Sequence, residues 1–385
     1  MWAVVGLSLV VLLVTYITHW ITQWRNPKCN GVLPPGSMGW PLVGETLNAM
    51  TSSYSIDLHP FFKKRLEKYG PIFRTSLAGT PIVVSADPEF SSYLFQQGGK
   101  LVELGFFDSF TKIFKISGEI NTAGSIIHKY IRSIALNHLG AETLKEKLLP
   151  LIEKTVVKTL ASWSSQASVE VKHASSVMLL NFGAKHMIGY DAETSSDNLS
   201  DKFFRIMNSF FSFPLNVPGT AYHNSLKDRN KITTMLRDML KKRRMSPDTH
   251  RGDFLDQISS DMDKEKFLSE DFAVYVVFGA LFAGFEPISS IMALAFSLLA
   301  EHPAALQELT VVSETLRLAN VAPALLRRAL KDIPVKGFTI PAGWTIMSLT
   351  SALQLSPKTF KDPLKFNPWR WKVRFRGEEE RGLVL

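Results

Sequence analysis

Hydrophobic positions are concentrated in two long runs, and the first of them opens the chain. Residues 2–22 read WAVVGLSLVVLLVTYITHWIT and contain no Asp, Glu, Lys or Arg. A helix of about 20 apolar residues crosses the hydrocarbon core of a bilayer. Arg25 and Lys28 follow the run. Because positive charge stays on the cytoplasmic side, the pattern predicts a single-pass anchor over residues 1–24 with the body in the cytosol. A cleaved signal peptide is the alternative, which the long run and the missing basic n-region disfavour.

Prolines and glycines interrupt the pattern directly after the anchor. Residues 26–44 read NPKCNGVLPPGSMGWPLVG, and their prolines and glycines prevent a regular helix or strand. We interpret residues 25–45 as a hinge that fixes how the body sits on its membrane, with an ordinary tether as the alternative. Cys29 lies in this hinge and is interpreted as an incidental thiol.

Helical periodicity dominates the body, which covers residues 46–385. One helix opens at Asp87-Pro88-Glu89, and further helices are predicted over residues 59–69, 126–139, 142–163, 200–213 and 230–245. Two β-rich runs over residues 72–86 flank Ala78-Gly79-Thr80 and predict a hairpin. Residues 339–349, around Pro341-Ala342-Gly343, predict a second hairpin. The fold class is therefore mainly α with small β-sheets.

The second apolar run covers residues 272–300 and contains a single charged residue, Glu286. Ser269 is a plausible N-cap, and Glu270 and Asp271 occupy the first turn, where negative charge is favourable. A second transmembrane helix is one interpretation, which Glu286 and Pro287 at its centre oppose. We prefer a helix through the middle of a large helical domain, where Glu286 requires a partner or a role.

Composition and charge exclude several classes of site. A single cysteine excludes an internal disulfide and any site built from several cysteines. Of the net charge of +9, the stretch 227–244 supplies eight Lys or Arg against two Asp. A solvated helix face is the first interpretation of this stretch and an anionic membrane surface the second. Nucleic acid is disfavoured, because no aromatic side chains alternate with the charges.

Several motifs in chain order resemble those of the cytochrome P450 family, the haem-thiolate monooxygenases. They are the hinge PPGSMGWPLVGET, HKYIR at 128–132, AGFE at 283–286, ETLR at 314–317 and FNPWRW at 366–371. Each motif is weak alone, but their order along nearly the whole chain is specific. The hinge, ETLRLAN and GFTIPAGW are most similar to the plant group that oxidises steroids and triterpenoids.

The resemblance implies roles for individual residues. Glu314, Arg317 and Arg370 would form a buried structural triad, since a buried carboxylate requires nearby cations. The residues that would contact haem propionates are His128, Arg132 and one of Arg327 and Arg328. A surface pair is the alternative for His128 and Arg132. The oxygen groove of the central helix would be formed by Ala283 and Gly284, with Glu286 in proton delivery.

The resemblance also implies partners and a location. Haem would be the cofactor, and an NADPH-dependent reductase would supply electrons. The substrate would be a hydrophobic small molecule, and the protein would be anchored in the endoplasmic reticulum membrane. Residues 210–218 (FFSFPLNVP) are candidates for pocket lining, with core packing as an equal interpretation.

Three departures from the family pattern qualify these expectations. The axial cysteine is absent: no Phe-x-x-Gly-x-x-x-Cys motif occurs, and Cys29 lies in the hinge. The interval from Ala283 to Glu314 is short, which predicts a gap near 310/311, and the tail 372–385 diverges. Pro287 replaces the usual threonine after the acid, and Ser289 lies elsewhere on the helix.

Two functional hypotheses follow from these features. In the first, the chain is an incomplete version of a membrane-bound monooxygenase of steroid- or triterpenoid-like substrates, lacking the haem-loop region and inactive as given. In the second, it is a non-catalytic, membrane-anchored remnant that binds a hydrophobic molecule or a partner.

Overall fold

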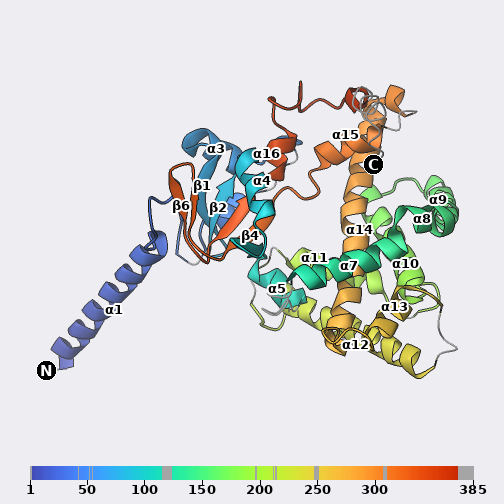
Figure 1. The fold of residues 1–385 in the computed structure, drawn as a ribbon, viewed down its shortest axis with the longest axis horizontal. Helices are drawn as coiled ribbons and strands as arrows, with labels where there is room; N and C mark the ends of the chain where they lie inside the picture. Colours follow the sequence, from blue (N-terminus) through green and yellow to red (C-terminus); the bar gives the residue numbers. More distant parts are fainter. Residues whose placement is uncertain are drawn as a thin grey trace. The chain divides into compact units, whose positions relative to one another are not determined.

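The computed structural model describes residues 2–41, 43–51, 53, 55–114, 124–195, 197–210, 212, 215–246, 251–306 and 310–371. These residues form two compact units (Figure 1). Unit 1 consists of Met1–Phe106 and Ala322–Lys365, and unit 2 of Phe107–Val321 and Phe366–Leu385. The predicted tail 372–385 and residues 307–309, beside the predicted gap, lie outside the described residues.

Unit 1 is built on a five-stranded sheet of order β1-β2-β7-β4-β3. Its strands are β1 (Ile72–Leu77), β2 (Thr80–Ser85), β3 (Val102–Leu104), β4 (Leu325–Ala329) and β7 (Thr345–Ser348). The pairs are antiparallel except for β2 and β7, which run parallel with Ile82 opposite Thr345. A separate two-stranded sheet contains β5 (Ile333–Val335) and β6 (Phe338–Ile340). The helices are α1 (Trp2–Arg25), α2 (Thr46–Ala49), α3 (Pro60–Tyr69), α4 (Pro88–Gln96) and α16 (Thr350–Gln354).

One of the two predicted hairpins is confirmed and the other is wrong. β1 and β2 pair around Ala78 and Gly79, both of which have positive φ, as a tight two-residue turn requires. The strands that flank Pro341-Ala342-Gly343 are β6 and β7, and they belong to different sheets. β6 pairs with β5, which precedes it in the chain, whereas β7 pairs with β2 and β4. The turn was visible in the sequence, but the distant partners of β7 were not.

Hydrogen bonds attach the hinge to the sheets and loops of unit 1. Arg74 N donates to Pro35 O at 2.8 Å, and Glu45 N donates to Ser76 O at 2.8 Å. The carboxylate of Asp332 accepts hydrogen bonds from Asn30 N at 3.0 Å and from Ala342 N at 2.9 Å. These contacts along the segment favour the interpretation as a hinge of fixed geometry over that of an ordinary tether.

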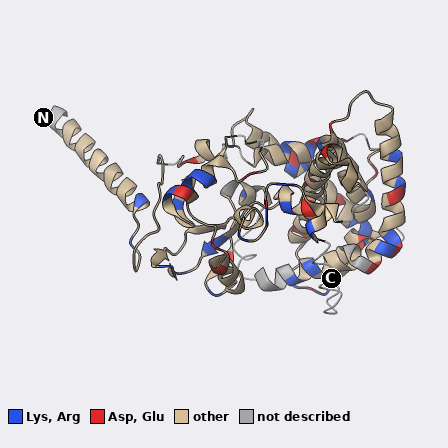
Figure 2. Cartoon of the chain, turned by 90° about the horizontal axis from the view of Figure 1, so that it is seen from above, with Lys and Arg blue, Asp and Glu red and all other residues tan. Residues whose placement is uncertain are grey.

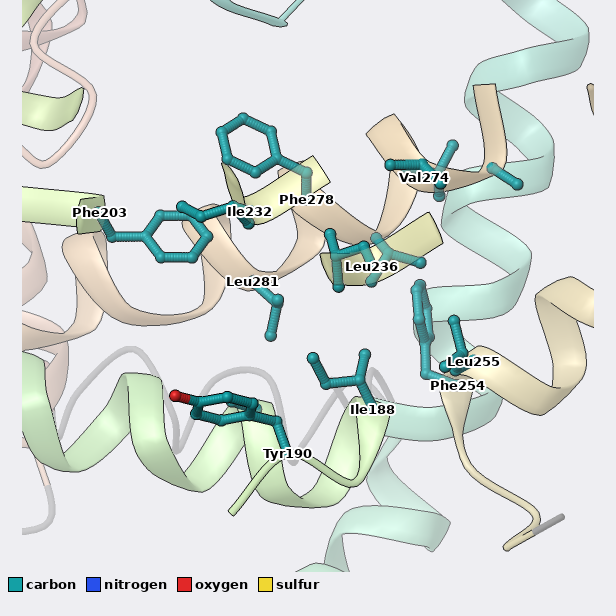
Figure 3. Packing of buried hydrophobic residues seen from close by; sticks show 14 of the residues in the cluster. Ile188, Tyr190, Phe203, Ile232, Leu236, Phe254, Leu255, Val274, Phe278 and Leu281 are labelled. Atoms are coloured by element: carbon teal, nitrogen blue, oxygen red, sulfur yellow. The ribbon is translucent and has the colours of Figure 1, made fainter. Parts of the chain in front are cut away.

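Unit 2 is almost entirely helical. Its elements are α5 (Asp108–Phe114), α7 (Gly124–Leu139), α8 (Ala141–Thr143), η1 (Leu144–Leu148), α9 (Leu149–Ser164), α10 (Val171–Ile188), α11 (Leu199–Ser209), α12 (Ala221–Met245), α13 (Phe254–Asp261), α14 (Glu270–Glu301), η3 (Pro303–Ala305), α15 (Val311–Ala319) and η4 (Pro368–Trp371). Its core joins α10, α11, α12, α13 and α14, as Figure 3 shows. The rings of Phe203 and Phe278 stack there with centroids 5.3 Å apart. The predicted fold class, mainly α with small sheets, is confirmed.

The second apolar run forms α14, the central helix of unit 2. Ser269 caps it, accepting a hydrogen bond from Phe272 N, as predicted. Ala273, Val277, Leu281 and Phe285 are buried at four-residue intervals, and their helix packs against α10 and α12. By length and composition α14 and Val5–Arg25 could each cross a membrane, but only α14 is substantially buried within the protein. We therefore interpret α14 as a core helix.

Three helix boundaries differ from the predicted ones. Residues 142–163 are interrupted by the π-turn η1, because Pro150 has no N–H to donate to the preceding turn. The helix predicted over 200–213 ends at Ser209, while α12 begins at Ala221, where Thr220 provides the N-cap. The predicted start at residue 230 missed this cap.

Candidate functional site

The predicted structural triad centres on a carboxylate in the interior of unit 2. Glu314 and Arg317 lie one turn apart on α15, and both side chains are buried. Arg317 Nε donates to Glu314 Oε2 at 3.0 Å, and Arg317 Nη2 donates to Oε1 at 2.8 Å. This is a two-pronged guanidinium–carboxylate contact, the arrangement that best satisfies a buried carboxylate. Arg370, on η4, adds a bond from Nε to Oε1 at 3.2 Å. The structure thus brings all three residues together.

Two further donors to Glu314 were not predicted from the sequence. Trp371 Nε1 donates to Oε2 at 2.9 Å, and Asn367 N donates to Oε1 at 3.1 Å. Burial by itself raises the pKa of Glu314, but the hydrogen bonds from Arg317, Trp371 and Asn367 outweigh it and hold the pKa below its usual value. Glu314 is therefore charged at neutral pH, and its hydrogen bonds connect η4 to α15.

The groove residues of the central helix lie on an open face of α14. Ala283 and Gly284 are exposed, and a Cβ atom added at Gly284 would meet nothing within 4 Å. Glu286 turns toward α10, where its Oε1 pairs with Lys172 Nζ at 3.0 Å and lies 3.4 Å from Ser290 Oγ. Its Oε2 is buried with no hydrogen-bond partner among the described residues. The central acid therefore has a cationic partner, but one of its oxygens is unsatisfied.

Pro287 lies inside α14 without ending the helix. Proline has no N–H, so the carbonyl of Ala283, four residues earlier, lacks its regular helical donor. Ser289 does not replace the missing threonine, because its hydroxyl is buried and donates to Glu286 O at 3.0 Å. The hydroxyl chemistry expected at this position is therefore absent from Pro287 and is not supplied by Ser289.

Replacing Pro287 with Ala is expected to stabilise unit 2. A proline in a helix interior costs roughly 3 kcal/mol, so we expect a gain of about 1–3 kcal/mol in the free energy of unfolding. Denaturant titration of the detergent-solubilised protein measures it. Pro303→Ala is the matched control, because Pro303 opens η3, where proline needs no N–H. An equal gain in both variants would contradict the explanation.

The structure separates the two candidate arginines of β4. Successive side chains of a strand point to opposite faces. Arg328 is exposed and lies 3.9 Å from the Glu103 carboxylate. Arg327 is half-buried over the ring of Phe95, 5.1 Å from its centroid, and forms no ion pair with any described residue. Burial lowers the pKa of the Arg327 guanidinium. Of the two, only Arg328 has a carboxylate within ion-pair distance among the described residues.

The remaining predicted propionate contacts lie on α7, in unit 2. Arg132 is exposed. The side chain of His128 lies outside the described part of the chain. Their role toward haem propionates stays a prediction.

The residues present do not fit a thiolate-ligated haem. In unit 1, the half-buried Arg327 forms no ion pair with any described residue, and its charge suits a propionate. In unit 2, taken by itself, Gly284 is exposed and a Cβ atom added there would meet nothing within 4 Å. The axial position requires a thiolate, however, and the single cysteine is Cys29 in the hinge. Its Sγ lies 3.3 Å from Gly31 O. Apart from Cys29, the 385 residues therefore contain no thiolate that could be the axial ligand.

The basic stretch 227–244 is only partly a solvated face. Arg243 is buried, where it pairs with Asp253 at 2.8 Å and with Asp256. Arg229 is also buried, and its Nη1 donates to Lys112 O at 2.9 Å. The interpretation as a solvated face is therefore wrong for these two residues, because acidic and carbonyl partners from distant segments enclose them.

Part of the apolar segment 210–218 belongs to the core. The ring of Phe210 lies 5.4 Å from that of Phe110 and 5.3 Å from that of Phe282, whereas Leu215 and Val217 are exposed. Phe211, Phe213 and Pro214 are outside the described residues.

Comparison with known proteins places the chain in a family. The family model described as Cytochrome P450 matches residues 34–310 and 309–378. The chain therefore belongs to the cytochrome P450 family, a class of haem-thiolate monooxygenases. The two matched segments overlap at residues 309 and 310, beside the predicted gap, which stays a prediction.

The relatives include plant hydroxylases. The chain is 46% identical over 402 aligned residues to the cucurbitadienol 11-hydroxylase of Siraitia grosvenorii, covering 97% of this chain and 85% of the relative. It is 45% identical to the beta-amyrin 16-alpha-hydroxylase CYP87D16 of Maesa lanceolata, with the same coverages. It is 32% identical to the cholesterol 22-hydroxylase CYP90B27 of Paris polyphylla, covering 95% and 82%. The predicted similarity to the plant group that oxidises steroids and triterpenoids is confirmed.

A solved structure shows the same fold. The retinoic acid bound cyanobacterial CYP120A1 superposes with a TM-score of 0.78 at 24% identity, covering 89% of this chain and 82% of that chain. At this identity the likeness supports the fold alone, and it confirms the predicted cytochrome P450-like architecture.

Proposed function

We propose that this chain is a membrane-anchored member of the monooxygenase family whose reaction is to hydroxylate a steroid- or triterpenoid-like molecule. The observation that carries the proposal is the buried Glu314–Arg317–Arg370 cluster, on residues that lie within the segments matched by the family. The substrate class rests on the named relatives, which act on cucurbitadienol, beta-amyrin and cholesterol. Haem is the cofactor that the family implies, with electrons from an NADPH-dependent reductase.

The proposal includes a restriction on the 385 residues themselves. Because they contain no cysteine besides Cys29, they provide no thiolate for the iron, and we infer that they are inactive alone. Pro287 is a second obstacle, since the threonine hydroxyl of the family is absent there. These two features also support the other hypothesis, a non-catalytic, membrane-anchored protein that binds a hydrophobic ligand or a partner.

A chimera distinguishes the two hypotheses. Residues 1–371 would be continued with the residues that follow the matching tryptophan position in the Siraitia relative, and the relative's own residues would be restored at the 309/310 junction. Microsomes carrying the chimera and a plant reductase would receive NADPH and cucurbitadienol, beta-amyrin or cholesterol. We expect a product with one added oxygen atom from at least one substrate, formed more slowly than by the full-length relative because the chimera retains Pro287. A chimera that binds haem as a thiolate yet oxidises none of them would favour the non-catalytic alternative.

The proposed location is the endoplasmic reticulum membrane, with α1 as the anchor and the body in the cytosol. Figure 2 shows that α1 carries no charged residue along its described length until Arg25 at its end. Positive charge after the apolar run is the feature that retains the following segment in the cytosol.

This orientation predicts that the sequon Asn198-Leu199-Ser200 stays unglycosylated. A cytosolic asparagine does not meet the lumenal glycosylation machinery. The fold also engages both polar residues, because Asn198 Oδ1 caps α11 through Asp201 N at 3.2 Å and Ser200 is buried against Asn181. A glycosidase-sensitive mass shift of the chain made in microsomes would contradict the orientation. The matched control inserts a sequon before Trp2, where the lumenal end should be glycosylated.

A further inference from the structure

We propose that α12 carries a binding site for an amphipathic anion, a molecule with a carboxylate or sulfate at one end of an apolar body. The site is a groove of about 660 Å³ on unit 2, and every described residue that lines it belongs to α12. Sites of roughly 300–1,000 Å³ are the size that small molecules occupy. The charge of the ligand distinguishes it from cucurbitadienol, beta-amyrin and cholesterol, which are uncharged, so the site goes beyond the proposed function.

One end of the groove contains a group of hydrogen-bond donors. Asn230, Lys231 and Thr234 line this end, and all three are exposed. Asn230 Oδ1 already accepts from Arg229 Nε at 3.1 Å and from Arg229 Nη2 at 2.7 Å, so the amide nitrogen of Asn230 is the group that remains as a donor. Lys231 forms no ion pair with any described residue. An ammonium, an amide N–H and a hydroxyl together can bind a carboxylate or a sulfate.

Two methionines continue the groove away from these donors. Met235 and Met239 lie one turn apart, are half-buried, and pack against the core of unit 2. They form an apolar floor, and their unbranched side chains adapt to ligands of irregular shape. At a rise of 1.5 Å per residue, Met239 lies about 12 Å along the helix from Lys231. The apolar body of the ligand should therefore be at least about that long, as it is in a long-chain carboxylate.

The charges along the groove place the anionic group at the Lys231 end. Asp238 is exposed in the groove and would repel an anion. It precedes Lys242 by four residues, a spacing at which opposite charges on a helix offset each other. Lys231 lies farther from Asp238, and the residue one turn before it is Lys227, a second exposed cation. Charge complementarity therefore favours a single anionic group beside Lys231.

Photolabelling of the full chain in a non-ionic detergent tests the site. The probe is a long-chain fatty acid with a diazirine in its alkyl chain, and the comparison probe is the neutral alcohol with the same diazirine. Labelled residues are located by mass spectrometry after proteolysis. Lys231→Gln removes the proposed charge contact, and Lys231→Arg restores it. Lys242→Gln is the matched control, because Lys242 also lines the groove but its charge is offset by Asp238.

We expect the acid to label α12 around Met235 and Met239, with competition by unlabelled acid, and the alcohol to label this region weakly. In Lys231→Gln the labelling should fall roughly fivefold, as expected for the loss of one charge contact, whereas Lys231→Arg and Lys242→Gln should stay close to the parent. Equal labelling by acid and alcohol, or no labelling of α12, would overturn the proposal. Equal losses in Lys231→Gln and Lys242→Gln would show that the overall charge of the helix attracts the acid, and would also overturn it.

Discussion

Replacing Arg317 with Met is expected to lower the free energy of unfolding by about 3–5 kcal/mol, the cost of leaving a buried charge without its partner. Arg317 provides two of the hydrogen bonds to the Glu314 carboxylate, and both side chains are buried. Arg370 Nε would still donate to Oε1 and Trp371 Nε1 to Oε2, but the two-pronged guanidinium contact would be lost. Denaturant titration of the detergent-solubilised chain measures the loss.

Lys365→Met is the matched control. Lys365 forms an ion pair with Asp362 at the same three-residue spacing, but both side chains are exposed. Exposed pairs contribute roughly 0–1 kcal/mol, so this variant should unfold almost as the parent does. Equal losses in the two variants would show that burial of the Glu314 pair is not the source of its effect.

The Glu314 cluster also predicts that the free energy of unfolding depends on pH in the acidic range. The pKa of Glu314 is held below its usual value in the folded chain, so its contribution to stability is present above the unfolded pKa of about 4.3. That contribution is lost as the pH falls through the lower, folded pKa. The difference in unfolding free energy between the parent and Glu314→Gln should therefore shrink below about pH 4. A difference that is constant from neutral pH to this range would contradict the assignment of a charged Glu314.

Features that depend on local chemistry were predictable from the sequence. The helix caps at Asp87 and Ser269 and the turn at Ala78-Gly79 follow from residues within a few positions of one another. The helix α10 was not predicted, because Ser175 and Ser176 interrupt its apolar pattern. Both serines are nevertheless buried, and the hydroxyl of Ser176 has a hydrogen-bond partner within the helix, since Oγ donates to Lys172 O at 2.8 Å.

Features that depend on distant partners were not predictable. The resemblance of the motifs to those of the family predicted that Glu314, Arg317 and Arg370 lie together. It did not predict that Trp371 also donates to Glu314. The sequence predicted Arg243 to be part of a solvated basic stretch, but in the fold it is buried and forms ion pairs with Asp253 and Asp256. Likewise, only the pairing of β4 shows which of its two arginines lies beside Phe95.

The largest expected effect concerns the iron. Expression of the 385 residues is expected to give no haem-thiolate protein, because thiolate ligation requires a cysteine beside the iron and Cys29 follows the anchor within the docked hinge. A neutral ligand such as a histidine can hold haem, but it gives a different spectrum from a thiolate. The chimera is the matched control, since it differs from the 385-residue chain only at the restored 309/310 junction and in the relative's residues that follow Trp371.

The carbon-monoxide difference spectrum of reduced microsomes tests this central claim most directly. The full-length Siraitia relative, expressed in the same cells, sets the position of the thiolate-type Soret band. We predict that band for the relative and for the chimera, and none for the 385-residue chain at matched protein levels. A thiolate-type Soret band from the 385 residues that disappears in Cys29→Ser would show that Cys29 reaches the iron, and would contradict the account.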